Sequence, residues 1–112
     1  MDWMMRGIVA AAVILVPVAG VAGALPQFDV PGYCRQVADS VGGSDMIRAG
    51  CQQQEQRNYN AVKARWGSMP ERTQAYCVQV AQSIGGSYQI LDGCLTQEMN
   101  SAGEAEGFEF QY

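Results

Sequence analysis

The chain contains one 23-residue unit twice, and this duplication limits its fold more than any other feature. Residues 33–55 and 76–98 are identical at 14 of 23 positions without a gap. Both copies follow the frame Y-C-x-Q-V-A-x-S-[VI]-G-G-S-x-x-I-x-x-G-C-x-x-Q-E, which contains all four cysteines of the protein. We call residues 33–55 repeat 1 and residues 76–98 repeat 2. We expect the two copies to form one domain.

Each repeat has the pattern of a helical hairpin. In repeat 1, Tyr33, Val37 and Val41 recur every four residues, which is the period of a helix face and not of a strand. The two glycines that follow end this helix, because glycine readily adopts the left-handed conformation of a helix C-cap. Ser44 can then cap a second helix. Repeat 2 predicts the same hairpin, and a long helix over residues 45–66 connects the two.

The cysteine positions predict one disulfide within each hairpin. In an antiparallel hairpin, two residues lie at equal height when their numbers average to the centre of the turn. Cys34 and Cys51 average to 42.5, and Cys77 and Cys94 average to 85.5, which are the centres of the two Gly-Gly turns. We therefore predict the pairs Cys34–Cys51 and Cys77–Cys94 over the two pairings that cross between repeats. Each disulfide should add about 3 kcal/mol to the free energy of unfolding if its geometry is unstrained.

Residues 1–24 have the pattern of a secretory signal peptide. An uncharged apolar run from Gly7 to Ala24 follows Arg6, and Ala22-Gly23-Ala24 supplies the small-x-small pattern of a cleavage site. We expect cleavage after Ala24 and a mature chain that begins near Leu25. The alternative is an uncleaved anchor, but the small residues weaken the hydrophobicity of its last turns. The prediction is a periplasmic or secreted protein with no integral membrane span after cleavage.

The predicted fold class is all-α. After the signal peptide, two disulfide-stapled helical hairpins form a small four-helix domain over residues 25–102. Ser68-Met69-Pro70-Glu71 matches a capping box, so we expect the third helix to begin there. Residues 103–112 are acidic and carry three alternating aromatic residues, and we expect them to form a mobile tail.

The composition excludes several kinds of chemistry. The protein has no histidine, which is the usual proton-transfer group near neutral pH and the commonest transition-metal ligand. Its net charge of -4 disfavours nucleic acid as a partner. The cysteines lack the C-x-x-C spacing of redox sites and zinc sites. We therefore expect no metal and no cofactor.

Two glutamates, one at the same position of each repeat, most invite a catalytic interpretation. Each follows a cysteine by four residues and lies on the same helix face. Residues equidistant from the centre of the turn lie at equal height on the two helices. This places Glu55 near the free amides at the start of the first helix, where negative charge is favourable. The same construction places Glu98 near Arg72 or Thr73. We favour these structural roles over catalysis.

Two further groups of residues have a packing interpretation and a functional one. Gly50 and Gly93 lie inside predicted helices, where glycine costs about 1 kcal/mol relative to alanine. We expect them to allow close approach of the helices beside each disulfide, and binding is the alternative. Tyr59, Val62 and Trp66 form an apolar stripe that either packs under the third helix or forms a partner-binding surface.

The frame C-x-x-V-A-x-x-x-G-G-S-x-x-I-x-x-x-C-x-x-Q-E resembles that of small exported proteins of alphaproteobacteria that carry one or two such cysteine units. The resemblance covers about residues 33–98. It implies the hairpin architecture and no activity. Repeat 1 has Asp45 where repeat 2 has Tyr88, so an aromatic role at that position is available only once.

These observations predict an exported, non-enzymatic module that has a structural role or binds a protein or a component of the cell envelope. A periplasmic chaperone or inhibitor-like binder that acts under envelope stress is the first alternative. A small hydrolase is the second. The sequence specifies no ligand, partner or oligomeric state.

Overall fold

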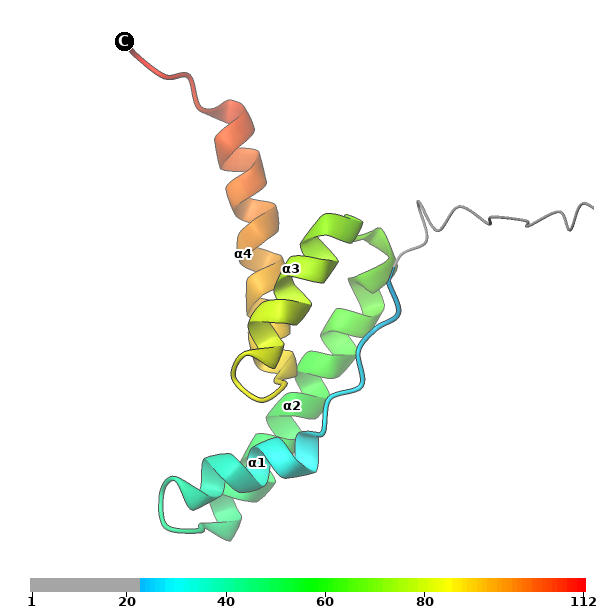
Figure 1. Ribbon diagram of the computed structural model, residues 1–112, viewed down its shortest axis with the longest axis vertical. Coiled ribbons are helices and arrows are strands. Elements are labelled where there is room, and N and C mark those ends of the chain that lie inside the picture. Colours follow the sequence, from blue (N-terminus) through cyan, green and yellow to red (C-terminus); the bar gives the residue numbers. More distant parts are fainter. Residues whose placement is uncertain (1–22) are drawn as a thin grey trace, which may run out of the picture.

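The structure is a computed structural model that describes residues 23–112, and these form four α-helices and one short 3-10 helix (Figure 1). The elements are α1 (Val30–Asp39), α2 (Asp45–Arg65), η2 (Trp66–Ser68), α3 (Glu71–Gln82) and α4 (Tyr88–Gly107). The described part of the chain contains no strand. The predicted all-α class with two helical hairpins is therefore confirmed.

Both hairpins turn at their Gly-Gly pairs, as predicted. The four glycines of these pairs have φ angles between 82° and 103°, in the left-handed region that glycine tolerates best. Each second helix is capped by the serine that follows. The Ser44 hydroxyl accepts a hydrogen bond from the Ile47 amide at 3.2 Å, and the Ser87 hydroxyl accepts one from the Ile90 amide at 3.3 Å.

The two predicted disulfides are present. Cys34 bonds to Cys51 and Cys77 bonds to Cys94, and the Cα atoms of each pair are 5.5 Å apart. Each bond joins the two helices of one hairpin. No free cysteine remains in the described part of the chain.

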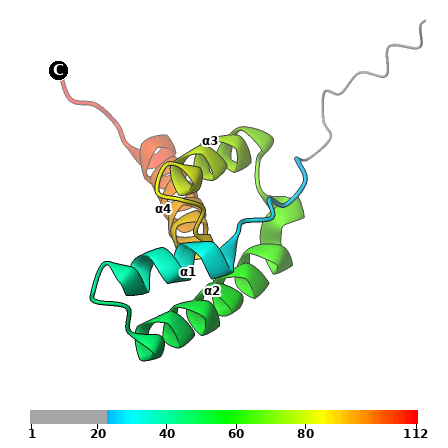
Figure 2. The same cartoon turned by 60° about the horizontal axis from the view of Figure 1, so that its bottom comes forward.

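The helices pack in the order α1, α2, α4, α3, so the two repeats meet through their second helices (Figure 2). The main core lies among α2, η2, α3 and α4, and α1 supplies none of its fully buried members. The buried residues of α1 are only Cys34 and Ala38. The core cluster consists of Val62, Trp66, Cys77, Ala81, Tyr88, Leu91 and Leu95.

Residues 23–29 form an extended segment that runs along α2 before α1 begins (Figure 1). Leu25 and Phe28 pack against the core. The Tyr88 hydroxyl donates a hydrogen bond to the Pro26 carbonyl at 2.7 Å and accepts one from the Phe28 amide at 2.9 Å. This segment is therefore part of the folded domain. The rest of the predicted signal peptide lies outside the described residues.

The predicted capping box at Ser68 is wrong. The chain forms the 3-10 turn η2 there, and the Ser68 hydroxyl donates to the Arg65 carbonyl at 2.7 Å. Helix α3 begins at Glu71, and its N-cap residue Pro70 makes no side-chain capping bond. The extra turn adds a bend between α2 and α3.

Helix α4 continues five residues beyond the predicted end of the domain at residue 102. Its last turns contain Ala102, Glu104, Ala105 and Glu106, which are good helix formers. These turns extend past α3 (Figure 1). Residues 108–112 are in neither a helix nor a strand. None of the helices in residues 23–112 has the length and hydropathy needed to cross a bilayer.

Candidate functional site

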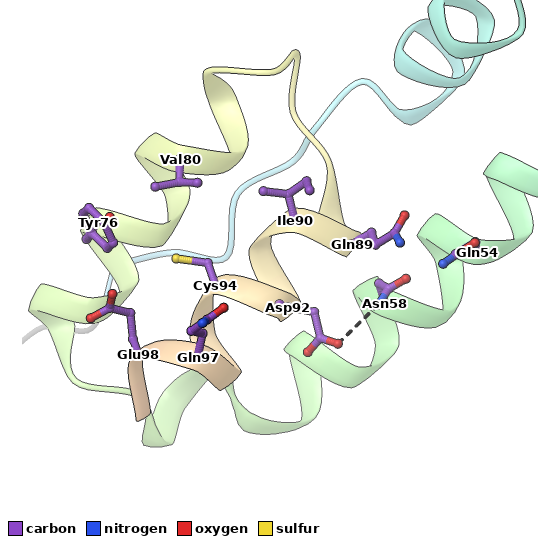
Figure 3. A pocket seen from close by; sticks show the side chains of 11 residues that line it. Gln54, Asn58, Tyr76, Val80, Gln89, Ile90, Asp92, Cys94, Gln97 and Glu98 are labelled. Atoms are coloured by element: carbon purple, nitrogen blue, oxygen red, sulfur yellow. Dashed lines mark hydrogen bonds between the residues drawn. The ribbon is translucent and has the colours of Figure 1, made fainter. Parts of the chain in front are cut away.

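Each repeat has a surface hollow beside its disulfide, and the two hollows are built from matching positions. We define groove 2 as the hollow of about 690 Å³ in repeat 2. Tyr76 and Val80 of α3 form one wall, and Ile90, Gly93 and Cys94 of α4 form the other (Figure 3). Its remaining lining residues are Gln54, Asn58, Gln89, Asp92, Gln97 and Glu98.

We define groove 1 as the corresponding hollow of about 470 Å³ in repeat 1. Tyr33 and Val37 of α1 face Ile47, Gly50 and Cys51 of α2 there. These five residues occupy the same positions of the repeat as the five wall residues of groove 2. The remaining lining residues are Met46, Gln53, Gln54, Glu55, Arg57 and Gln89.

The two grooves adjoin. Gln54 of α2 and Gln89 of α4 line both of them. Several apolar side chains around this face are open to solvent, including Met46 at 79% exposure and Tyr76 at 51%. One face of the domain therefore carries two similar hollows side by side, each with apolar walls and several polar lining residues.

The glycines in the grooves are not required by packing inside the protein. A Cβ atom built on Gly50 or on Gly93 would meet nothing within 4 Å. The predicted close approach of helices at these glycines is therefore wrong. Each glycine instead leaves bare backbone on the wall of a groove, at a helix-propensity cost of about 1 kcal/mol.

The acidic residues of groove 2 have different partners. Asp92 forms an ion pair with Arg65 at 2.6 Å and accepts a hydrogen bond from Asn58 at 3.2 Å. Arg65 also donates to the Thr96 hydroxyl at 2.9 Å, so it links α2 to α4. Sequence reasoning missed this link, because Arg65 and Asp92 belong to helices whose packing the repeat pattern does not specify.

Glu98 makes no hydrogen bond or ion pair with the residues in the described part of the chain. Its side chain lies between α4 and α3 in groove 2 (Figure 3). The predicted contact with Arg72 or Thr73 is not formed, and Arg72 is exposed to solvent. The groove thus presents a carboxylate that the fold does not use.

Glu55 occupies the same repeat position but is buried, with 1% of its surface exposed. Its carboxylate accepts hydrogen bonds from the Ser87 hydroxyl at 2.6 Å and from the Tyr88 amide at 2.5 Å. Glu55 therefore stabilises the N-terminus of α4, and the prediction that it serves the first helix is wrong. The prediction used only the positions mirrored across the turn of repeat 1. In the structure the turn of repeat 2 packs onto α2 and supplies the hydrogen-bond donors.

Tyr88 anchors the contact between the repeats. Its ring lies 4.7 Å from the Phe28 ring and 4.9 Å from the Tyr59 ring, measured between centroids. Burial raises the pKa of the Tyr88 phenol above 10.0, although the hydrogen bond from the Phe28 amide opposes this effect. The matching residue of repeat 1, Asp45, is exposed and pairs with Arg48.

The apolar stripe of Tyr59, Val62 and Trp66, which runs from the second half of α2 into η2, lies in the core. Val62 is fully buried, Trp66 is 7% exposed, and Tyr59 packs against the same cluster. Helix α2 packs on α4 here, and the core cluster also contains Cys77 and Ala81 of α3. Their position favours the packing interpretation and leaves little surface for a partner.

The site is chemically suited to holding apolar side chains. Residues 23–112 contain no group of three or more cysteine, aspartate and glutamate residues placed to hold a metal ion. No protein family, curated protein or solved structure matches the chain. The proposals below therefore depend on the residues of grooves 1 and 2 and on their surroundings.

Proposed function

We propose that the protein is an exported, non-enzymatic module that binds a partner protein through grooves 1 and 2. One observation carries this proposal: Gly50 and Gly93 occur at the same position of both repeats, and both face open space. Because the same helix-weakening residue lines the same wall of both grooves without a packing role inside the fold, contact with another molecule explains it. Bare backbone allows such a molecule to approach closely.

The lining of the grooves indicates the chemistry of the partner segment. Tyrosine, valine and isoleucine side chains and a disulfide form the walls of both. Residues 73–112 contain five acidic residues and no lysine or arginine. In groove 2, Glu98 adds a carboxylate without an internal partner. We infer that the partner segment is apolar and carries a basic residue that pairs with Glu98.

Export is supported by two independent features. The apolar run that ends at Ala24 has the pattern of a signal peptide. The two disulfides are of a kind that persists in oxidising compartments such as the periplasm and the cell exterior. The resemblance to exported alphaproteobacterial proteins agrees with this location.

The test compares binding by three variants of the exported protein. Gly50→Leu and Gly93→Leu each place a side chain in a groove, and the Cβ atom of neither would meet a neighbour within 4 Å. Gly103→Leu is the matched control, because Gly103 is also an open glycine of α4 but lines neither groove. Each protein is crosslinked in its own cell envelope, and captured proteins are quantified by mass spectrometry.

We expect the wild type and Gly103→Leu to capture the same protein, and each groove variant to lose at least about tenfold of it, as for a blocked interface centre. Equal capture by all four proteins would contradict the proposal. If the four instead suppress aggregation of an unfolded client equally well, the chaperone alternative is favoured. Helicity and disulfide content verify that each variant is folded.

A further inference from the structure

The first described residue, Gly23, is held by side chains that are distant in sequence. Its amide donates a hydrogen bond to the Gln74 side-chain oxygen at 3.2 Å. Its carbonyl accepts one from the Trp66 indole N–H at 2.7 Å. Both backbone polar groups of this one residue are thus bound by residues of η2 and α3.

Gln74 is buried, and its side chain is held by hydrogen bonds on both sides. It is 2% exposed, and its side-chain NH₂ donates to the Trp66 carbonyl at 2.7 Å. The side-chain oxygen of Gln74 has Gly23 as its partner. A buried amide oxygen without a partner is destabilising. The polar part of the core is therefore complete only when Gly23 is present.

Cleavage after Ala24 would remove Gly23 and deprive Gln74 and Trp66 of these hydrogen bonds. A second small-x-small pattern, Gly20-Val21-Ala22, ends immediately before Gly23. We propose that the signal peptidase cuts between Ala22 and Gly23, and that the α-ammonium group of Gly23 then docks on Gln74. The inference rests on the proposed export and revises the predicted cleavage site by two residues.

The surroundings can also hold a free ammonium group. Gly23, Gln74 and Glu71 line the same small cavity of about 230 Å³. A free amine has three donor hydrogens and a positive charge, whereas a peptide amide has one donor and no charge. The Gln74 oxygen accepts one of these hydrogens, and the Glu71 carboxylate supplies negative charge on the same cavity.

The direct test is the N-terminal sequence and intact mass of the protein purified after export. We expect the first residue to be Gly23. A first residue at Leu25, or at any other position after the apolar run, would overturn the inference and leave the proposed export intact. A chain that still begins at Met1 would also overturn the inference, because it would show the uncleaved anchor.

A second test measures whether Gly23 and Gln74 are energetically coupled. Proteins that begin at Gly23 or at Leu25 are compared, each with Gln74 or with Gln74→Ala. We expect Gln74→Ala to lower Tm by roughly 4 to 8 °C more in the longer protein, the size expected for one buried hydrogen bond in a domain of this length. Equal shifts in the two proteins would overturn the inference. Gln79→Ala, an exposed change on the same helix, should shift both equally and slightly.

Discussion

The two repeats share one local sequence but lie in different surroundings. In repeat 2 the turn is covered: a Cβ on Gly86 would meet the Phe28 ring at 3.0 Å, and Ser87 is fully buried. In repeat 1 the turn is open, since a Cβ on the matching Gly43 would meet only the Asp39 side chain, at 4.0 Å. Both turns nevertheless adopt the same conformation. The hairpin therefore depends on local residues, and tertiary packing adds stability to only one of the two.

The repeated glutamates show the same contrast. Glu55 joins the repeats, because it accepts hydrogen bonds from Ser87 and Tyr88 at the start of α4. Glu98 lies at the matching position but lines groove 2 without such donors. A duplicated side chain is thus structural in one copy and available for binding in the other. This difference can be tested copy by copy.

The largest contrast is expected between the effects of removing the two disulfides on the stability of the fold. Replacing Cys77 and Cys94 with alanine should lower the free energy of unfolding by about 3 kcal/mol or more, because it removes a loop constraint and opens the main core. Replacing Cys34 and Cys51 should instead release α1, whose buried residues are only Cys34 and Ala38. Urea unfolding with hydrogen exchange distinguishes these outcomes. Global loss of protection in both variants would contradict the contrast.

The next largest contrast is expected between Glu55 and Glu98, in the loss of stability when each is replaced by glutamine. Glu55→Gln replaces a buried carboxylate that accepts two hydrogen bonds, and we expect a loss of about 1.5 to 3 kcal/mol. Glu98→Gln should change the free energy of unfolding by less than about 0.5 kcal/mol, as for other surface changes. Thermal and urea unfolding of the two variants provide the comparison. Equal losses would show that Glu98 also supports the fold.

The position that distinguishes the repeats, Tyr88 against Asp45, gives a pH-dependent prediction. Because burial raises the pKa of Tyr88 in the folded state, its contribution to stability is present below pH 10.0 and is lost as the pH rises above that value. Tyr88→Phe should reduce this alkaline loss, and it should cost about 1 kcal/mol at neutral pH. Tyr76→Phe is the control, because Tyr76 is 51% exposed. Identical alkaline profiles for both variants would contradict the prediction.

A small effect of the opposite sign is expected at the groove glycines. Gly50→Ala and Gly93→Ala should each raise the free energy of unfolding by about 0.5 to 1 kcal/mol, because alanine favours the helix and meets no neighbour. Differential scanning calorimetry can measure the rise in Tm. A fall in Tm at either position would show that the glycine has an internal packing role.

The hairpins and their disulfides could be predicted because they follow from local rules. Helix period, Gly-Gly turns and the level positions of Cys34 and Cys51 all lie within one repeat. The contact between repeats could not be derived in this way. The repeat pattern places Glu55 at the wrong helix, because nothing within its own hairpin indicates that α4 packs on α2.

The grooves were missed for a related reason. The sequence shows that Gly50 and Gly93 weaken their helices, but this cost alone does not tell whether the space beside a glycine is filled or open. Gln74 gave no signal, because a glutamine in a polar stretch of helix resembles a surface residue until its partners are known. In both cases the missing information was the position of elements distant in sequence.

The most direct test of binding through both repeats is site-specific photo-crosslinking in the exported protein. A photoreactive phenylalanine analogue replaces Tyr33 in groove 1, Tyr76 in groove 2, or Gln79, an exposed residue of α3 that lines neither groove. We predict that positions 33 and 76 yield adducts with the same partner protein and that position 79 yields none. Adducts from position 79 alone, or equal adducts from all three positions, would contradict binding through the grooves.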